Sequence, residues 1–166
     1  MGVPEPFNEV FMAHTYEAPG WQDYCMEYRE PFNTLESELE EITAVDGALN
    51  ALRANGLISQ VGYDQDAFLA HRNAVRASFD IPWTAISPRM ERLIWAINSI
   101  RRPSCMVAAG VFCGFTFICN AGAGAGPGAT HGADVLIGVE IKEDEAERAE
   151  RNVRTVDRTG TARVVA

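Results

Sequence analysis

The sequence predicts an α/β protein, with a helical region followed by the first half of a Rossmann-like, doubly wound parallel sheet of three strands. Three short apolar runs, each typical of a buried strand, follow residue 103, and segments of helical periodicity separate them. Strands that alternate with helices form βαβ units with parallel strands. Three strands are an incomplete sheet of this kind, so we expect a fragment of a longer fold or association with its missing half.

Composition fits one globular domain. The chain has 166 residues, of which 47% are hydrophobic and 22% charged. No run approaches the roughly 18 apolar residues of a membrane span. The N-terminus also lacks the features of a secretory signal. We therefore expect a cytoplasmic protein without a membrane partner.

The charge balance argues against nucleic acid as a partner. The formal net charge is -9, whereas nucleic-acid binding relies on a positive surface that releases counterions. Four arginines do gather around one predicted helix, where we expect them at its solvated ends: Arg89, Arg92, Arg101 and Arg102.

Cysteines and histidines do not indicate a metal site. The four cysteines, Cys25, Cys105, Cys113 and Cys119, form no C-x-x-C pair, and no histidine has ligand spacing to any of them. We expect reduced, buried thiols.

Residues 1–33 are predicted to form an irregular arm that contains both prolines and aromatic residues. A disordered tail would be poor in aromatic side chains, so the arm is expected to pack on something. It could cover the core, complete a dimer or close over a substrate pocket.

Residues 34–102 are predicted to be helical. Asn33 resembles a cap for the first helix, which Asn55 and Gly56 end. A second helix is expected from Asp64 to about Phe79, and a third begins with Ser87 as cap and Pro88 at its first position. The predicted buried faces contain Leu35, Leu39, Ile42, Leu49 and Leu52, then Phe68, Arg72, Val75 and Phe79, then Met90, Leu93, Ile94, Ile97 and Ile100.

Residues 103–166 are predicted to hold the sheet. "CMVAAGV" after Pro103, "DVLIGVEI" at residues 134–141 and "ARVVA" at the end are the expected strands. The charged helix between the last two has glutamate–arginine pairs at spacing i,i+4 and a small apolar face, formed by Ala146, Ala149, Val153 and Val156.

A conspicuous glycine run, "NAGAGAGPGATHG" at residues 120–132, satisfies a loose G-x-G-x-x-G/A pattern. A phosphate-binding loop needs a strand before it and a helix after it. No helix fits between this run and the strand near Asp134, so we expect a loose connector.

A better candidate for nucleoside binding is "AAGVFCGF" at residues 108–115. It follows the first strand, contains Gly110 and Gly114, and opens a short helix. Glu140 ends the second strand, where a carboxylate can accept hydrogen bonds from both ribose hydroxyls. Strand order therefore predicts that the loop and Glu140 form one site.

The stretch from Ile86 onward resembles the class I S-adenosylmethionine-dependent methyltransferases. It looks most like the small-molecule O-methyltransferases of the catechol and caffeoyl-CoA type, through "ISP" at 86–88, "GVFCGFT" at 110–116 and "GVEIK" at 138–142. The resemblance implies S-adenosylmethionine as cofactor, with Glu140 on the ribose and Ile141 against the adenine. The loop backbone would approach the cofactor and the side chains of Phe112 and Cys113 would lie along it, so the implied cofactor-binding residues are Gly110, Val111, Phe112, Cys113, Gly114, Glu140 and Ile141.

The sequence departs from that family at Ala108, where an acidic residue usually helps to hold the methionine end of the cofactor. In the catechol-type enzymes, carboxylates after the third strand hold a divalent metal. Such ligands would lie beyond Ala166, so no metal ligand and no catalytic residue is assigned.

The resemblance implies methyl transfer to a small molecule, at oxygen, by a homo-oligomer or in association with the missing half of the fold. Two alternatives remain open. The chain could be a non-catalytic protein that uses the methyltransferase fold to assemble with a partner. It could also be a dinucleotide-dependent oxidoreductase, although "GVFCGF" lacks the G-x-G-x-x-G spacing.

Overall fold

The computed structural model describes residues 38–79 and 86–166. Within them, five helices accompany a three-stranded parallel sheet, which confirms the α/β class. The predicted arm at residues 1–33 and the Asn33 cap lie outside the described residues. The elements are α3 (Glu38–Ala54), α4 (Gln65–Ser78), α5 (Pro88–Arg101), β1 (Cys105–Ala109), α6 (Phe115–Ala121), β2 (Val135–Val139), α7 (Glu143–Val156) and β3 (Ala162–Val165).

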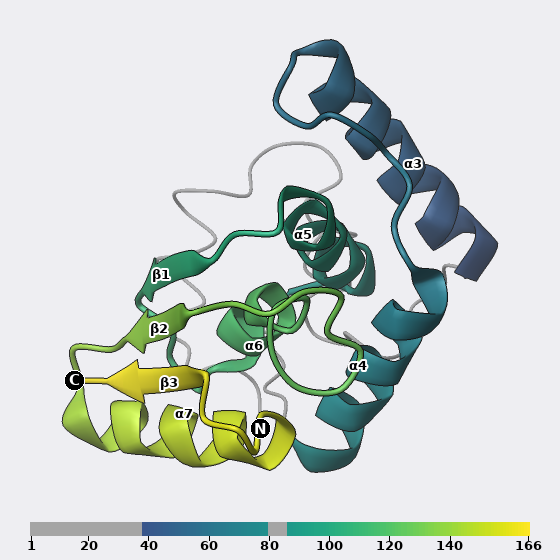
Figure 1. The fold of residues 1–166 in the computed structure, drawn as a ribbon. Coiled ribbons are helices and arrows are strands. Elements are labelled where there is room, and N and C mark those ends of the chain that lie inside the picture. The colour runs from purple at the N-terminus through teal and green to yellow at the C-terminus, as the bar shows by residue number, and fades with distance from the viewer. Residues whose placement is uncertain (1–37, 80–85) are drawn as a thin grey trace, which may run out of the picture.

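The strands lie in the order β1-β2-β3, all parallel, so α6 and α7 belong to the two crossover connections (Figure 1). The register sets Ala108 opposite Gly138, and Gly138 opposite Val164. All three carboxyl ends therefore meet at one edge, the edge from which the loop at Gly110 and the turn at Glu140 emerge.

Within residues 38–79 and 86–166, the sheet is packed on one face only. Side chains of Met106, Leu136 and Val164 contact the main core together with α6 and α7. The alternate residues point away from that core, and Val107 is 65% exposed and Val165 41%. The expectation of strands buried on both faces is therefore wrong for the described residues, because α6 and α7 share the same face of the sheet.

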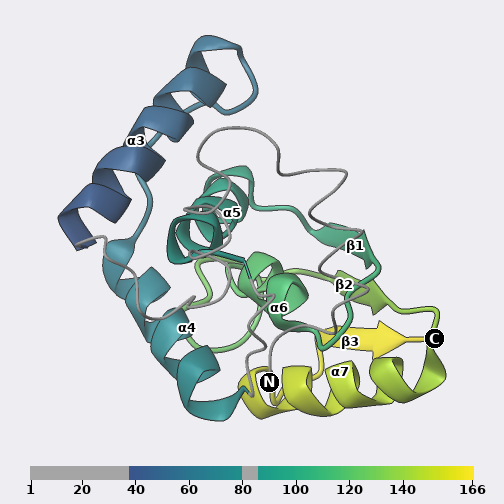
Figure 2. The ribbon, with the colours of Figure 1, turned by 180° about the vertical axis from the view of Figure 1, so that it is seen from behind.

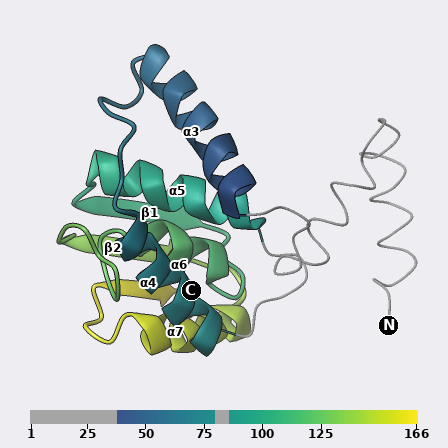
Figure 3. The same ribbon diagram turned by 90° about the vertical axis from the view of Figure 1, so that its right-hand side faces the viewer.

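The predicted ends of α4 and α5 are confirmed. The Asp64 carboxylate accepts a hydrogen bond of 2.9 Å from the Ala67 amide, and Ser87 caps α5 ahead of Pro88. Arg102 follows α5 in the left-handed conformation, with φ 50°. Figure 3 shows α3, α5 and α7 at successive levels of the molecule, with α3 at the end farthest from α7.

Two helical faces differ from the predicted ones. Leu39 is 74% exposed and Met90 is 43% exposed, whereas Glu41 and Arg92 are buried. The Glu41 carboxylate accepts hydrogen bonds of 2.6 Å from both Arg72 and Arg92, which come from the two neighbouring helices. Placing Arg92 at a solvated helix end was therefore wrong, because this ion cluster holds it between α3, α4 and α5.

The cysteines divide into two environments. Cys113 and Cys119 are buried, as expected, while Cys105 on β1 is exposed and departs from that expectation. Cys25 lies outside the described residues. Cys105 is on the sheet face that α6 and α7 leave open, which accounts for its exposure.

The glycine run does connect α6 to β2, but it is packed rather than loose. Figures 1 and 2 show the connection curving beside α4. A Cβ at Gly122 would overlap the His71 ring, and one at Gly128 would overlap the Ala67 carbonyl. The glycines are needed because the connection runs directly against the first turns of α4. No helix among the described residues is long and apolar enough to cross a membrane.

Candidate functional site

The loop after β1 turns sharply into α6 at the carboxyl edge of the sheet. Gly110 and Gly114 have φ values of 71° and 85°, a region that favours glycine. The Gly110 amide donates a 2.8 Å hydrogen bond to the Val139 carbonyl, and the Gly114 amide donates one of 2.8 Å to Val111. These bonds hold the loop against the end of β2.

Glu140 directly follows β2 and binds the loop. Its Oε2 accepts a hydrogen bond of 2.8 Å from the Phe112 amide, and its Oε1 accepts one of 3.3 Å from the Lys142 amide. The Phe112 and Lys142 amides together lower the pKa of Glu140 below its usual value. An ionised carboxylate oxygen has two lone pairs, so each oxygen retains one for a ligand hydroxyl.

Phe112 adopts a backbone conformation that is unusual for a residue with a side chain. Its φ is 50°, and Arg102 is the only other non-glycine residue with positive φ in the described part of the chain. The Phe112 side chain is 45% exposed, and the Arg148 guanidinium lies 5.5 Å from the centre of its ring. Such conformations cost on the order of 1 kcal/mol and gather at ligand-binding sites.

The side chains named from the resemblance separate into two groups. Phe112 and Ile141 are exposed beside Glu140, and Ile141 is 93% exposed. Val111 and Cys113 are buried in the main core instead, and burial raises the pKa of the Cys113 thiol. The structure therefore places the Cys113 side chain inside the protein and not along the open surface of the loop.

The packing of α7 explains why position 114 is a glycine, and nothing in the sequence indicated this contact. A Cβ at this position would lie 3.2 Å from the Ala149 carbonyl and 3.2 Å from a methyl group of Val153, both on α7. A side chain at position 114 would therefore press on α7. Gly110 differs, because a Cβ there would point into open space beside the loop.

Asn152 is a site residue that the sequence did not indicate. Its side-chain amide donates a hydrogen bond of 3.0 Å to the Cys113 carbonyl, and so fixes the loop to α7. In the sequence Asn152 is one polar residue among many on a charged helix. Only the packing of α7 against α6 identifies its partner.

Ala108 stands on β1 two residues before Gly110, and its side chain packs against the main core on the helix-covered face. It offers no charge to a ligand. Among residues 38–79 and 86–166, no group of three or more histidine, cysteine, aspartate or glutamate side chains could hold a metal ion. The charged group at this edge that contacts the loop backbone is Glu140.

A comparison with models of protein families gives no match to this chain, and a comparison with curated proteins finds no similar sequence.

Proposed function

We propose that this protein transfers a methyl group from S-adenosylmethionine to a small molecule, at oxygen. The observation that carries the proposal is the hydrogen bond between the Phe112 amide and Glu140. It joins a glycine loop after one parallel strand to a carboxylate at the end of the next. In open α/β sheets, ligands bind outside the carboxyl ends of the strands.

The residues present fit the nucleoside part of this cofactor. The free lone pairs of Glu140 would accept hydrogen bonds from the ribose hydroxyls, and open space beside Gly110 leaves the loop backbone accessible. Exposed Phe112 and Ile141 would offer apolar contact to the base. Ala108 offers nothing to the charged amino-acid end, which would need a group from elsewhere.

In methyl transfer, the main role of these residues would be to position the reactants. When bound, the cofactor supplies an electrophilic methyl group on a sulfonium. The chain would hold the ribose at Glu140 and keep the loop rigid through Asn152. Holding two reactants in line accounts for much of the rate in such transfers.

Calorimetry with S-adenosylhomocysteine tests the proposal. We expect heat of binding from the parent protein and at least tenfold weaker binding by Glu140→Ala, since a charged hydrogen bond contributes about 1.5–3 kcal/mol. Glu143→Ala is the matched control, because Glu143 is an exposed glutamate in the first turn of α7. No heat from the parent protein would overturn the proposal. Quenching of NADH fluorescence by the protein would instead favour a dinucleotide oxidoreductase.

A second candidate is assembly with a partner chain without catalysis. The exposed face of the sheet favours it, since Val107, Val135 and Val165 are all apolar and solvent-accessible and parallel sheets are ordinarily covered on both faces. Light scattering after size-exclusion chromatography distinguishes the candidates. An oligomer that binds no S-adenosylhomocysteine would favour assembly alone.

A further inference from the structure

A hollow lies at the opposite edge of the sheet from Glu140. It is bounded by the segment before α4, the end of α5 and the last part of the glycine run, and has a volume of about 440 Å³. Arg102, in its lining, precedes β1, whereas the Gly110 loop follows β1. The full length of a strand therefore separates this hollow from the proposed cofactor site, and the inference is independent of that site.

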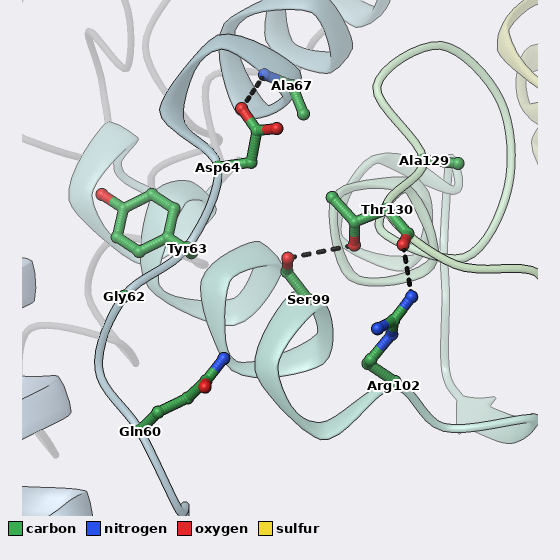
Figure 4. A pocket seen from close by; sticks show the side chains of 9 residues that line it. All are labelled: Gln60, Gly62, Tyr63, Asp64, Ala67, Ser99, Arg102, Ala129 and Thr130. Carbon is green, nitrogen blue, oxygen red and sulfur yellow. Dashed lines mark hydrogen bonds between the residues drawn. The ribbon is translucent and has the colours of Figure 1, made fainter.

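Two opposite charges face this hollow without pairing with each other (Figure 4). Arg102 donates one hydrogen bond, of 2.8 Å, to the Thr130 carbonyl. It makes no ion pair with any residue that the structure describes, so within that part of the chain most of its N–H donors are free. Asp64 uses Oδ1 to cap α4, and its Oδ2 has no hydrogen-bond partner among residues 38–79 and 86–166. Figure 4 shows Asp64 and Arg102 on opposite sides of the hollow.

Hydroxyl groups lie between the two charges. Ser99 Oγ and Thr130 Oγ1 are 3.0 Å apart. Thr130 donates its hydroxyl proton to the Ala123 carbonyl at 3.3 Å, so Ser99 is the donor in the pair. The lone pairs of Ser99 are then left to accept a hydrogen bond from a ligand N–H.

We propose that this hollow binds a short zwitterionic peptide, with its terminal ammonium at Asp64 and its carboxylate at Arg102. Asp64 and Arg102 are farther apart than the 4.0 Å of an ion pair. A ligand that meets both must bridge them, and a peptide also has an internal N–H to offer Ser99, which a single amino acid lacks. Guanidinium groups bind carboxylates in bidentate fashion, and Ser99 is placed to accept from the peptide N–H.

The backbone conformation of Arg102 directs its side chain to this hollow. Arg102 and Phe112 are the two non-glycine residues with positive φ among those described, and each lines one of the two sites. In Arg102 this conformation turns the chain at the end of α5 and leaves the guanidinium beside Thr130.

Titration of the protein with L-alanyl-L-leucine, followed by NMR, tests the proposal. We expect saturable binding, with dissociation constants of about 1 mM or tighter. Capping the peptide's amine by acetylation, or its carboxylate by amidation, should each weaken binding about tenfold. Free L-leucine should bind more weakly than the dipeptide.

Single substitutions test which end of the peptide each charged residue binds. Arg102→Gln should weaken binding of the free dipeptide about tenfold. The matched control Arg101→Gln, which changes the preceding exposed arginine, should leave that binding unchanged. Asp64→Asn keeps a good helix cap. This variant should weaken binding of the free dipeptide but leave binding of the acetylated dipeptide unchanged. Absence of binding at about 10 mM dipeptide, or equal binding of free and acetylated peptides, would overturn the proposal.

Discussion

The amide of Phe112 donates a hydrogen bond of 2.8 Å to Oε2 of Glu140 and thereby connects the two crossover units of the sheet. The loop containing Phe112 leads into α6, and Glu140 lies just before α7. Because the carboxylate accepts from backbone amides, any residue other than proline at position 112 could donate the same bond. Changes at Glu140 should therefore alter the loop as well as any ligand contact.

The first prediction concerns the titration of Glu140. Hydrogen bonds from the Phe112 and Lys142 amides lower its pKa from 4.5. A carboxyl with a depressed folded-state pKa stabilises the fold above its unfolded pKa, and this contribution is lost as the pH falls through the folded value. NMR titration of the side-chain carboxyl carbon should give a midpoint below 4.5. A midpoint at or above that value would contradict the hydrogen bonds described.

The second prediction concerns the glycines of the connection between α6 and β2. Gly122→Ala should lower the free energy of unfolding by about 1–3 kcal/mol, because the new methyl group overlaps the buried His71 ring. Gly132→Ala is the control, since nothing lies near a Cβ there, and we expect a change within about 0.5 kcal/mol. Urea denaturation measures both. Equal effects would mean that the connection does not pack on α4.

The third prediction concerns His71, which is completely buried under this connection. Among the residues that the structure describes, neither ring nitrogen has a partner with regular hydrogen-bond geometry. Burial, and secondarily the charge on Arg72, lowers its pKa from 6.5 to about 4, while the Pro127 backbone acts in the opposite direction. Stability should therefore fall as the pH drops from 6.5 toward 4, by an amount on the order of 3 kcal/mol.

Urea denaturation at several pH values measures this loss. His71→Leu should remove most of the dependence in that window, whereas His131→Gln, on a half-buried histidine, should retain it. A parent protein whose stability is constant over the window would show that His71 is accessible to protons in the folded state.

The elements that the sequence predicted well are those whose burial depends on one neighbour. The face of α7 with Ala146, Ala149 and Val153 is buried as predicted, because the periodic small residues lie against the sheet. Strand order likewise sufficed to bring Gly110 and Glu140 to the same edge. Local pattern alone determines both features.

The helices that contact several elements were predicted less well. Hydrophobicity placed Met90 in the core and Arg92 in solvent, yet Arg92 is completely buried. Its position depends on Glu41, which lies on a helix distant in the sequence. A single amino-acid sequence gives no sign of that pairing. In the loop, similarly, the positive φ of Phe112 decides which side chains turn inward, and Cys113 turns into the core.

The fourth prediction concerns the ion cluster that joins α3, α4 and α5. Burial would raise the pKa of Glu41, but hydrogen bonds from Arg72 and Arg92 outweigh it and lower the pKa. Glu41→Ala should destabilise the fold by about 3–5 kcal/mol, because it removes the carboxylate shared by two buried arginines. Among the described residues, Arg72 would keep only Glu91, and Arg92 only the exposed Glu38, as carboxylate partners. The midpoint temperature of thermal unfolding should then fall by roughly 6–20 °C for a chain of this size.

Glu38→Ala is the matched control for this cluster. Glu38 also contacts Arg92, at 3.1 Å, but its side chain is 59% exposed. Exposed ion pairs contribute about 0–1 kcal/mol, so this variant should unfold within a few degrees of the parent. If Glu38→Ala and Glu41→Ala were equally mild, water would have to reach the cluster and solvate the arginines. The two variants therefore compare an exposed partner of Arg92 with a buried partner that also binds Arg72.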